Sequence, residues 1–176
     1  MKYSLKIPIV LVCAAILMAL TRLWAIEPVP LPALQLTGMD GQIIKTSDLP
    51  SKGNWLLVYV NPKSHFCDEM LKLMKKDEYP DLAPNTVFVV AGSVDDAKAM
   101  QAKYPDVAAA SWYADPVRDA FTRLKLHGMP TVIGINQQTM KWTVNGVIPD
   151  PNTFKAILSS WIQRQVVPKS NAPKSN

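Results

Sequence analysis

Cysteine is scarce in this 176-residue chain, which contains only two, Cys13 and Cys67. Cys13 lies inside an apolar N-terminal run, so the rest of the chain holds a single thiol. One thiol excludes a disulfide within that remainder, and it excludes a zinc site built from pairs of cysteines. The sequence therefore leaves room for monothiol chemistry at most.

The chain also lacks a run of basic residues, although its formal net charge is +5. Residues 1–26 hold three of the 19 basic residues and no acidic residue, so the remainder carries about +2. Its basic residues are scattered along the sequence. Binding to nucleic acid normally requires a clustered basic surface, so we expect no nucleic-acid partner. No cofactor is expected either.

The N-terminal segment, residues 1–26, has the pattern of an export signal. Lys2 and Lys6 form a charged start, and residues 7–20 are almost entirely apolar. As a helix, 14 residues extend about 21 Å, which is short of the ~30 Å hydrocarbon core of a membrane. That length favours a cleaved signal peptide.

An uncleaved anchor is the alternative, and it is the one that we favour. Residues 7–26 reach membrane-spanning length if Arg22 extends to the interface, and bulky residues precede the possible cleavage sites. In both cases the lysines hold the N-terminus in the cytoplasm. The rest of the chain is then expected at the periplasmic side of a bacterial inner membrane, or free in the periplasm after cleavage.

The remaining sequence predicts one domain with flexible ends. Residues 27–32 are rich in proline and predict an extended spacer. Residues 33–165 are enough for one domain with a single core. Residues 166–176 contain Pro-Lys-Ser-Asn twice and predict a disordered tail.

Hydrophobic patterns predict alternating strands and helices in the domain. An Asp-Gly turn at residues 40–41 predicts a hairpin over residues 34–46. The further strands are expected at 55–60, 86–91, 108–113, 131–135 and 140–144. The helices are expected at 66–78, 94–104, 116–124 and 151–163. This order predicts a three-layer α/β/α domain with a central mixed sheet and an added N-terminal hairpin.

The stretch Ser64-His65-Phe66-Cys67 lies where the strand at 55–60 turns into a helix. This position resembles the Cys-x-x-Cys turn of the thioredoxin-like superfamily, and most closely that of its TlpA-like membrane-anchored thiol–disulfide oxidoreductases. Three further segments carry the resemblance, in matching order over about residues 33–163. They are the entry segment at 34–49, Gly128-Met129-Pro130-Thr131 and Asn145-Gly146.

The resemblance implies a cis-proline at Pro130 and a groove that binds an extended peptide. Met129 and Thr131 would line this groove together with His65 and Phe66. The peptide would belong to an envelope partner protein or a client.

The sequence departs from that family at its centre. Ser64 stands where the family has its attacking cysteine, and Cys67 matches the resolving position. A hydroxyl cannot replace a thiolate in disulfide exchange, so ordinary dithiol turnover is disfavoured. Cys67 is then either an inert, buried residue or a monothiol that forms mixed disulfides with partners. Ser64 is most simply the N-cap of the helix.

Two other chemistries are open at the same residues. Peroxiredoxins place a hydroxyl residue three positions before a single reactive cysteine, as Ser64 and Cys67 do here. A peroxidase would also need an arginine near the thiolate, and Arg118 or Arg123 would have to supply it. A metal site for copper or zinc would need His65, Cys67 and His127 together, although solvent-facing histidines are the favoured interpretation. The leading hypothesis is an exported partner-binding or monothiol redox module.

Overall fold

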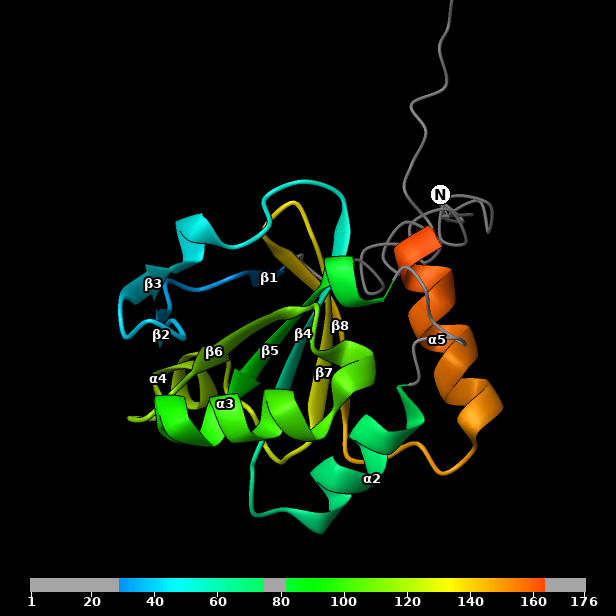
Figure 1. Cartoon of the computed structure of the whole chain (residues 1–176). Helices are drawn as coiled ribbons and strands as arrows, with labels where there is room; N and C mark the ends of the chain where they lie inside the picture. The colour runs from blue at the N-terminus through cyan, green and yellow to red at the C-terminus, as the bar shows by residue number, and fades with distance from the viewer. Residues whose placement is uncertain (1–28, 75–81, 164–176) are drawn as a thin grey trace, which may run out of the picture.

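The computed structural model describes residues 29–74 and 82–163, which form an eight-stranded sheet with helices on both faces (Figure 1). The strand order is β1-β8-β7-β4-β5-β6-β2-β3. β4, β5 and β6 run parallel, whereas β7 and β8 are antiparallel to their neighbours. The strands are β1 (Val29–Pro30), β2 (Gln35–Thr37), β3 (Ile43–Lys45), β4 (Asn54–Val60), β5 (Thr86–Val90), β6 (Ser111–Ala114), β7 (Thr131–Asn136) and β8 (Thr139–Asn145).

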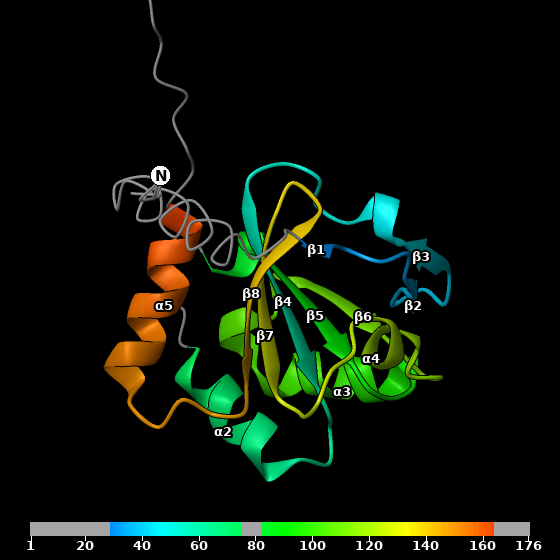
Figure 2. The ribbon, with the colours of Figure 1, turned by 180° about the vertical axis from the view of Figure 1, so that it is seen from behind.

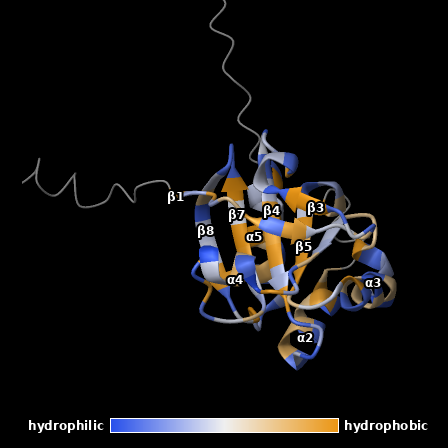
Figure 3. Ribbon diagram, turned by 90° about the vertical axis from the view of Figure 1, so that its left-hand side faces the viewer, coloured by the Kyte–Doolittle hydropathy of each residue, from blue (hydrophilic) through white to orange (hydrophobic). Residues whose placement is uncertain are grey.

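The sheet is buried at its centre because its middle strands are apolar along most of their length, with Asn54 and Thr86 as polar residues at the starts of β4 and β5. Every residue of β4 and of β5 is buried, as expected for strands that helices cover on both faces. Figure 3 shows this pattern, with β4, β5 and β7 largely hydrophobic and the outer β8 more polar. The expected mixed sheet between two helical layers is confirmed.

Two hydrophobic cores lie on opposite faces of the sheet, since successive side chains of a strand point to opposite sides. On one face, Val58 packs with residues of α2 (His65–Leu73), α3 (Val94–Lys103) and α5 (Pro151–Gln163). On the other face, Tyr59 packs with α4 (Asp119–Arg123) and with the chain between β1 and β2. Figure 2 shows the molecule from behind, with α4 and α5 at opposite ends of the sheet.

Two helices begin or end differently from the sequence prediction. α2 ends at Leu73 and not near residue 78, because Met74 leaves the helical conformation and its side chain enters the core; residues 75–81 lie outside the described part. α4 begins at Asp119, so Pro116 is not in its first turn. The buried Asp115 accepts the backbone N–H groups of Asp119 and Ala120, at 2.8 and 3.1 Å, and thereby sets this later start.

The other boundaries agree closely with the pattern. The α3 helix starts at a capping box, in which Ser93 and Asp96 bind each other's backbone N–H groups, and α5 has the predicted bounds. β6 starts only at Ser111, because a 3-10 turn at Pro105–Val107 occupies the chain before it.

The two sheet edges are formed by the N-terminal part of the domain. β2 and β3 form the predicted hairpin, and its turn contains Gly41 with a φ of +84°. Val29 and Pro30 were expected within a spacer that holds the domain away from the membrane. They are extended, but they pair with Met140 and Thr139 of β8, and Leu31 is buried. This part of the predicted spacer therefore belongs to the sheet.

No helix within the described ranges is both long and apolar enough to cross a membrane. The predicted signal or anchor at residues 1–26 and the tail at 166–176 lie outside those ranges, as does Cys13.

Candidate functional site

The site is centred on the entrance of α2, where Cys67 is fully buried. Cys67 is 0% exposed and belongs to the core under α2. The chain leaves β4 at Val60 and turns, so that the backbone N–H of Asn61 donates to the Cys67 Sγ at 3.3 Å. The sulfur therefore lies beneath the turn and not on the surface, which matches the inert, buried interpretation of this residue.

Burial raises the pKa of the Cys67 thiol above its usual range, and this is the largest influence on it. Hydrogen bonds from the Asn61 N–H and from the Ser64 side chain lower the pKa, but they do not outweigh burial. A thiol with a raised pKa holds little thiolate at neutral pH and is a poor nucleophile. The local chemistry thus disfavours a reactive Cys67.

Ser64 occupies the N-cap position of α2, but its side chain makes no capping hydrogen bond. The predicted N-cap position is therefore confirmed, whereas the expected side-chain hydrogen bond to the first backbone N–H groups is absent. Its backbone carbonyl starts the helix by accepting from the Cys67 and Asp68 N–H groups, at 3.1 and 3.2 Å, while its hydroxyl is directed to the sulfur of Cys67. Ser64 and Cys67 are consequently close neighbours, as the Ser-x-x-Cys spacing suggests.

A loop held by β8 contains Pro130. The Met129–Pro130 peptide bond is cis. Gly146 donates its N–H to the Pro130 carbonyl at 2.7 Å, and the Thr131 hydroxyl is hydrogen-bonded to the Asn145 side chain at 2.9 Å. Thr131 is 0% exposed, so it cannot line a peptide groove as predicted. It instead joins the loop to the end of β8.

An apolar groove of about 660 Å³ lies between α2 and this loop. Phe66 forms part of its wall and is 60% exposed, which is unusual for a large aromatic side chain. Of the predicted peptide-binding residues, the structure brings Phe66 and Met129 together in this groove, whereas Pro130 is buried and His65 does not line it. Among the described residues, its lining comprises Phe66, Glu69, Lys72, Leu73, Met129, Gly146, Val147 and Pro149.

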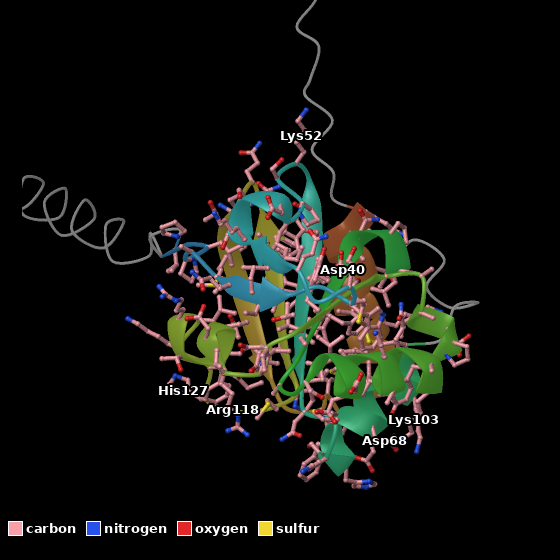
Figure 4. The ribbon with its side chains drawn as sticks, turned by 60° about the vertical axis from the view of Figure 1, so that its left-hand side comes forward. Asp40, Lys52, Asp68, Lys103, Arg118 and His127 are labelled. Carbon is pink, nitrogen blue, oxygen red and sulfur yellow. The ribbon has the colours of Figure 1, made fainter. Side chains whose placement is uncertain are left out.

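The two histidines do not form a metal site. His65 is exposed on α2, where its Nε2 lies 2.9 Å from a Glu69 carboxylate oxygen. His127 projects from the corner near Arg118 (Figure 4). Within the described residues, no group of three histidine, cysteine or acidic side chains is placed to hold a metal ion. The copper or zinc candidate at His65, Cys67 and His127 is therefore wrong.

The arginines considered for a peroxidase have other surroundings. Arg123 pairs with Asp119 at 2.6 Å on α4, in the layer on the opposite face of the sheet from Cys67. Arg118 lies near Tyr59, whose side chain belongs to that same opposite face. No arginine is among the groups that shift the pKa of Cys67.

Asp68 is the centre of an ionic cluster that joins α2 to α3. This cluster was not predicted from the sequence. Asp68 accepts hydrogen bonds from Lys103, the last residue of α3, and from Tyr104, the residue after it. It also forms an ion pair with Lys72 on its own helix, α2. Figure 4 shows Asp68 and Lys103 side by side. The i,i+4 spacing of Asp68 and Lys72 could be predicted from the sequence. The contact between Asp68 and Lys103 of α3 could not, because the two residues are 35 positions apart in the chain.

The cluster makes stability depend on pH. Hydrogen bonds, first from Lys103, then from Lys72 and Tyr104, hold the pKa of Asp68 well below its usual range. Ionised Asp68 therefore stabilises the fold above pH ~4, and this contribution is lost as the pH falls through the depressed folded-state pKa. We expect Asp68→Asn to lower the free energy of unfolding by about 1 kcal/mol at pH 7, since its partners are partly exposed cations.

Urea titrations of the parent and Asp68→Asn at pH 7 and at about pH 2.5 check this expectation. The difference between the two proteins should shrink at the lower pH. An unchanged difference at both values would show that the charge of Asp68 is not the source of its contribution.

The overall arrangement is similar to that of several solved structures of thiol–disulfide interchange proteins and thioredoxins. A putative thiol:disulfide interchange protein DsbE from Chlorobium tepidum superposes with a TM-score of 0.61 at 21% identity, over 77% of this chain and 94% of the other. A secreted Mycobacterium tuberculosis disulfide oxidoreductase, described as homologous to E. coli DsbE, gives 0.58 at 14% identity, covering 72% and 95%.

This likeness decides the architecture. The chain has the thioredoxin fold. The exposed lipoprotein thioredoxin Etrx1 of Streptococcus pneumoniae agrees, with a TM-score of 0.54 at 19% identity over 73% of this chain and 99% of that one. No family model matches the sequence, and no curated protein matches it. At such low identities the similarity concerns the fold, so activity has to be argued from the site itself.

Proposed function

We propose that this chain is an exported, membrane-anchored thioredoxin-fold protein that binds an extended apolar segment of an envelope partner or client without dithiol turnover. The groove beside a buried single sulfur is the observation that carries this proposal. Phe66, Leu73, Met129, Val147 and Pro149 supply apolar surface, and such concave apolar surfaces are the usual places for ligands.

Charge at the groove is concentrated on α2. Glu69 and Lys72 lie at the wall formed by this helix, and both already have partners, His65 and Asp68 respectively. The charged groups of the groove are confined to one wall, and the rest of its lining is apolar. Such a groove can accept a segment that inserts an apolar side chain beside Phe66. The resemblance to the TlpA-like type supports an extended peptide next to the Met129–Pro130 loop.

A monothiol redox role at Cys67 is the second candidate, and one observation favours it. The Asn61 N–H and the Ser64 side chain both bind the sulfur and would stabilise a thiolate. Burial acts in the opposite direction and is the stronger influence, so mixed-disulfide formation would require α2 to open. Peroxidase chemistry has less support, because neither Arg118 nor Arg123 acts on the sulfur.

The groove is tested with peptides selected for binding to the purified protein from a random display library. Phe66→Ala should weaken the best peptide about tenfold or more, as is typical for a central aromatic contact. Fluorescence polarisation measures the affinity. Ile43→Ala is the matched control, because Ile43 is also 60% exposed but lies on β3 at the opposite sheet edge from β8.

Cys67→Ala separates the two candidates in the same assay. Retained affinity in this variant supports binding through the groove surface. Loss of binding together with a disulfide-trapped peptide in the parent would assign the role to the sulfur. Equal weakening by Phe66→Ala and Ile43→Ala would contradict the groove.

A further inference from the structure

Two exposed basic residues bracket α4, and both have left-handed backbone conformations. Arg118, before the helix, has a φ of 58°, and Lys125, after it, has a φ of 52°. Side chains with a Cβ are strained in this region, which favours glycine. Beside them, Val117 is 81% exposed, more than any other large hydrophobic residue described.

Lys125 stands where glycine is the usual residue of a helix end. The Leu126 N–H donates to the Phe121 carbonyl and the Lys125 N–H donates to the Thr122 carbonyl, both at 3.1 Å. This pair of bonds is the Schellman motif, whose left-handed position Lys125 occupies. Within the described residues, neither Lys125 nor Arg118 forms an ion pair, so no internal contact of that kind offsets the strain.

The surface around these residues is positively charged. Between residues 116 and 127, Arg118, Arg123 and Lys125 face a single acidic residue, Asp119, which is paired with Arg123. Arg118 and His127 project outward from the same corner of the molecule (Figure 4). We call Val117, Arg118, Lys125 and His127 the α4 surface.

The α4 surface belongs to the layer through which the chain enters the domain. Leu31, which follows β1, packs in the same core as Ala120 and Leu124. Only residues 27 and 28 separate the apolar segment at 7–26 from Val29. Three peptide units span at most about 10 Å, so an uncleaved anchor would keep β1 close to the lipid. Six residues after Val29, the backbone N–H of Gln35 donates to Asp119 of α4 at 3.1 Å, which ties α4 to the entering chain.

We propose that the α4 surface docks on the anionic headgroups of the membrane that holds the N-terminal segment, with Val117 entering the interface between its basic neighbours. This inference rests on the anchored form of the proposed function. Exposed apolar residues flanked by lysine and arginine are typical of interfacial docking. Each basic residue near an anionic surface strengthens binding about fivefold, and the tether makes such weak contacts sufficient because docking is intramolecular.

The full chain, reconstituted through its N-terminal segment, tests the docking. An environment-sensitive fluorophore is attached at Val117→Cys in a Cys13→Ser, Cys67→Ala background, and Ile43→Cys serves as the matched position. Vesicles contain either phosphatidylcholine alone or phosphatidylcholine with phosphatidylglycerol. We expect a blue shift at position 117 only with phosphatidylglycerol, its loss at about 0.5 M salt because charge is screened, and no shift at position 43.

Arg118→Gly and Lys125→Gly test the charge without loss of folding. Both positions favour glycine, so each variant should be at least as stable as the parent in urea. Each should nevertheless reduce about fivefold the equilibrium constant for docking that is derived from the phosphatidylglycerol-dependent shift. Phe66→Ala should leave the shift unchanged, which separates this proposal from the groove.

Three results would overturn the docking. One is an equal response of position 117 in both kinds of vesicle. A second is an unchanged shift in the two glycine variants. The third is a response to soluble poly-glutamate combined with none to phosphatidylglycerol, which would assign the α4 surface to an acidic protein partner.

Discussion

Ser64→Cys is expected to give the protein a much higher thiol–disulfide exchange activity than the parent has. The Ser64 side chain lowers the pKa of the Cys67 thiol, and the Ser64 carbonyl accepts the Cys67 N–H at 3.1 Å, so we expect a sulfur at position 64 to lie close to that of Cys67. The position is also less buried than Cys67 and sits at a helix entrance, where a thiolate is stabilised by the helix dipole and free N–H groups. This is the geometry that a two-cysteine cycle requires.

The measurement is reduction of a small disulfide, such as oxidised glutathione, in the presence of excess dithiothreitol. We expect the rate of the variant to exceed the parent rate about 100-fold, because the described part of the parent holds a single thiol, Cys67, which is buried and has no attacking cysteine at position 64. Mass spectrometry should find an intramolecular disulfide in the oxidised variant. Ser64→Ala is the control for loss of the hydroxyl alone. A variant that stays fully reduced under air and diamide would refute the predicted closeness of the two side chains.

Asp115→Ala is expected to lower the free energy of unfolding by about 3–5 kcal/mol, because it removes one partner from a buried polar cluster. Asp115 and Tyr59 are both 0% exposed, and the Tyr59 hydroxyl donates to the Asp115 carboxylate at 2.8 Å. The same carboxylate accepts the N–H groups of Asp119 and Ala120 at the start of α4. Its loss leaves a buried hydroxyl without its acceptor and the helix without its cap.

Burial, followed by the hydrogen bond to Asp115, raises the pKa of Tyr59 above its usual range. The hydroxyl therefore stays protonated and remains a donor throughout the neutral range. Urea unfolding at pH 7 measures the effect. Asp119→Ala is the matched control, since Asp119 is partly exposed and pairs with Arg123, and it should cost about 1 kcal/mol or less. A loss of less than about 1 kcal/mol for Asp115→Ala would show that the cluster is not a major contributor.

The candidate site was only partly predictable from the sequence. The Ser-x-x-Cys turn and the Met129–Pro130 loop were found because each follows or precedes an apolar strand. Thr131 was assigned to the groove, although its side chain turns inward to Asn145. A metal site would have required the two histidines close together. Instead, His65 lies on the exposed side of α2 and His127 near Arg118, in agreement with the favoured prediction that both face solvent.

The sequence by itself determined the fold, because apolar runs such as β4 and β5 can be buried only between helical layers, and the order of strands and helices then permits few topologies. It also determined that a second active-site sulfur is missing. Tertiary structure alone decided that Cys67 is buried, that Phe66 and Met129 line one groove, that Asp68 meets α3, and that Arg118 and Lys125 have left-handed conformations at the two ends of α4. Each of these depends on side-chain direction and on contacts between distant segments, which local patterns do not encode.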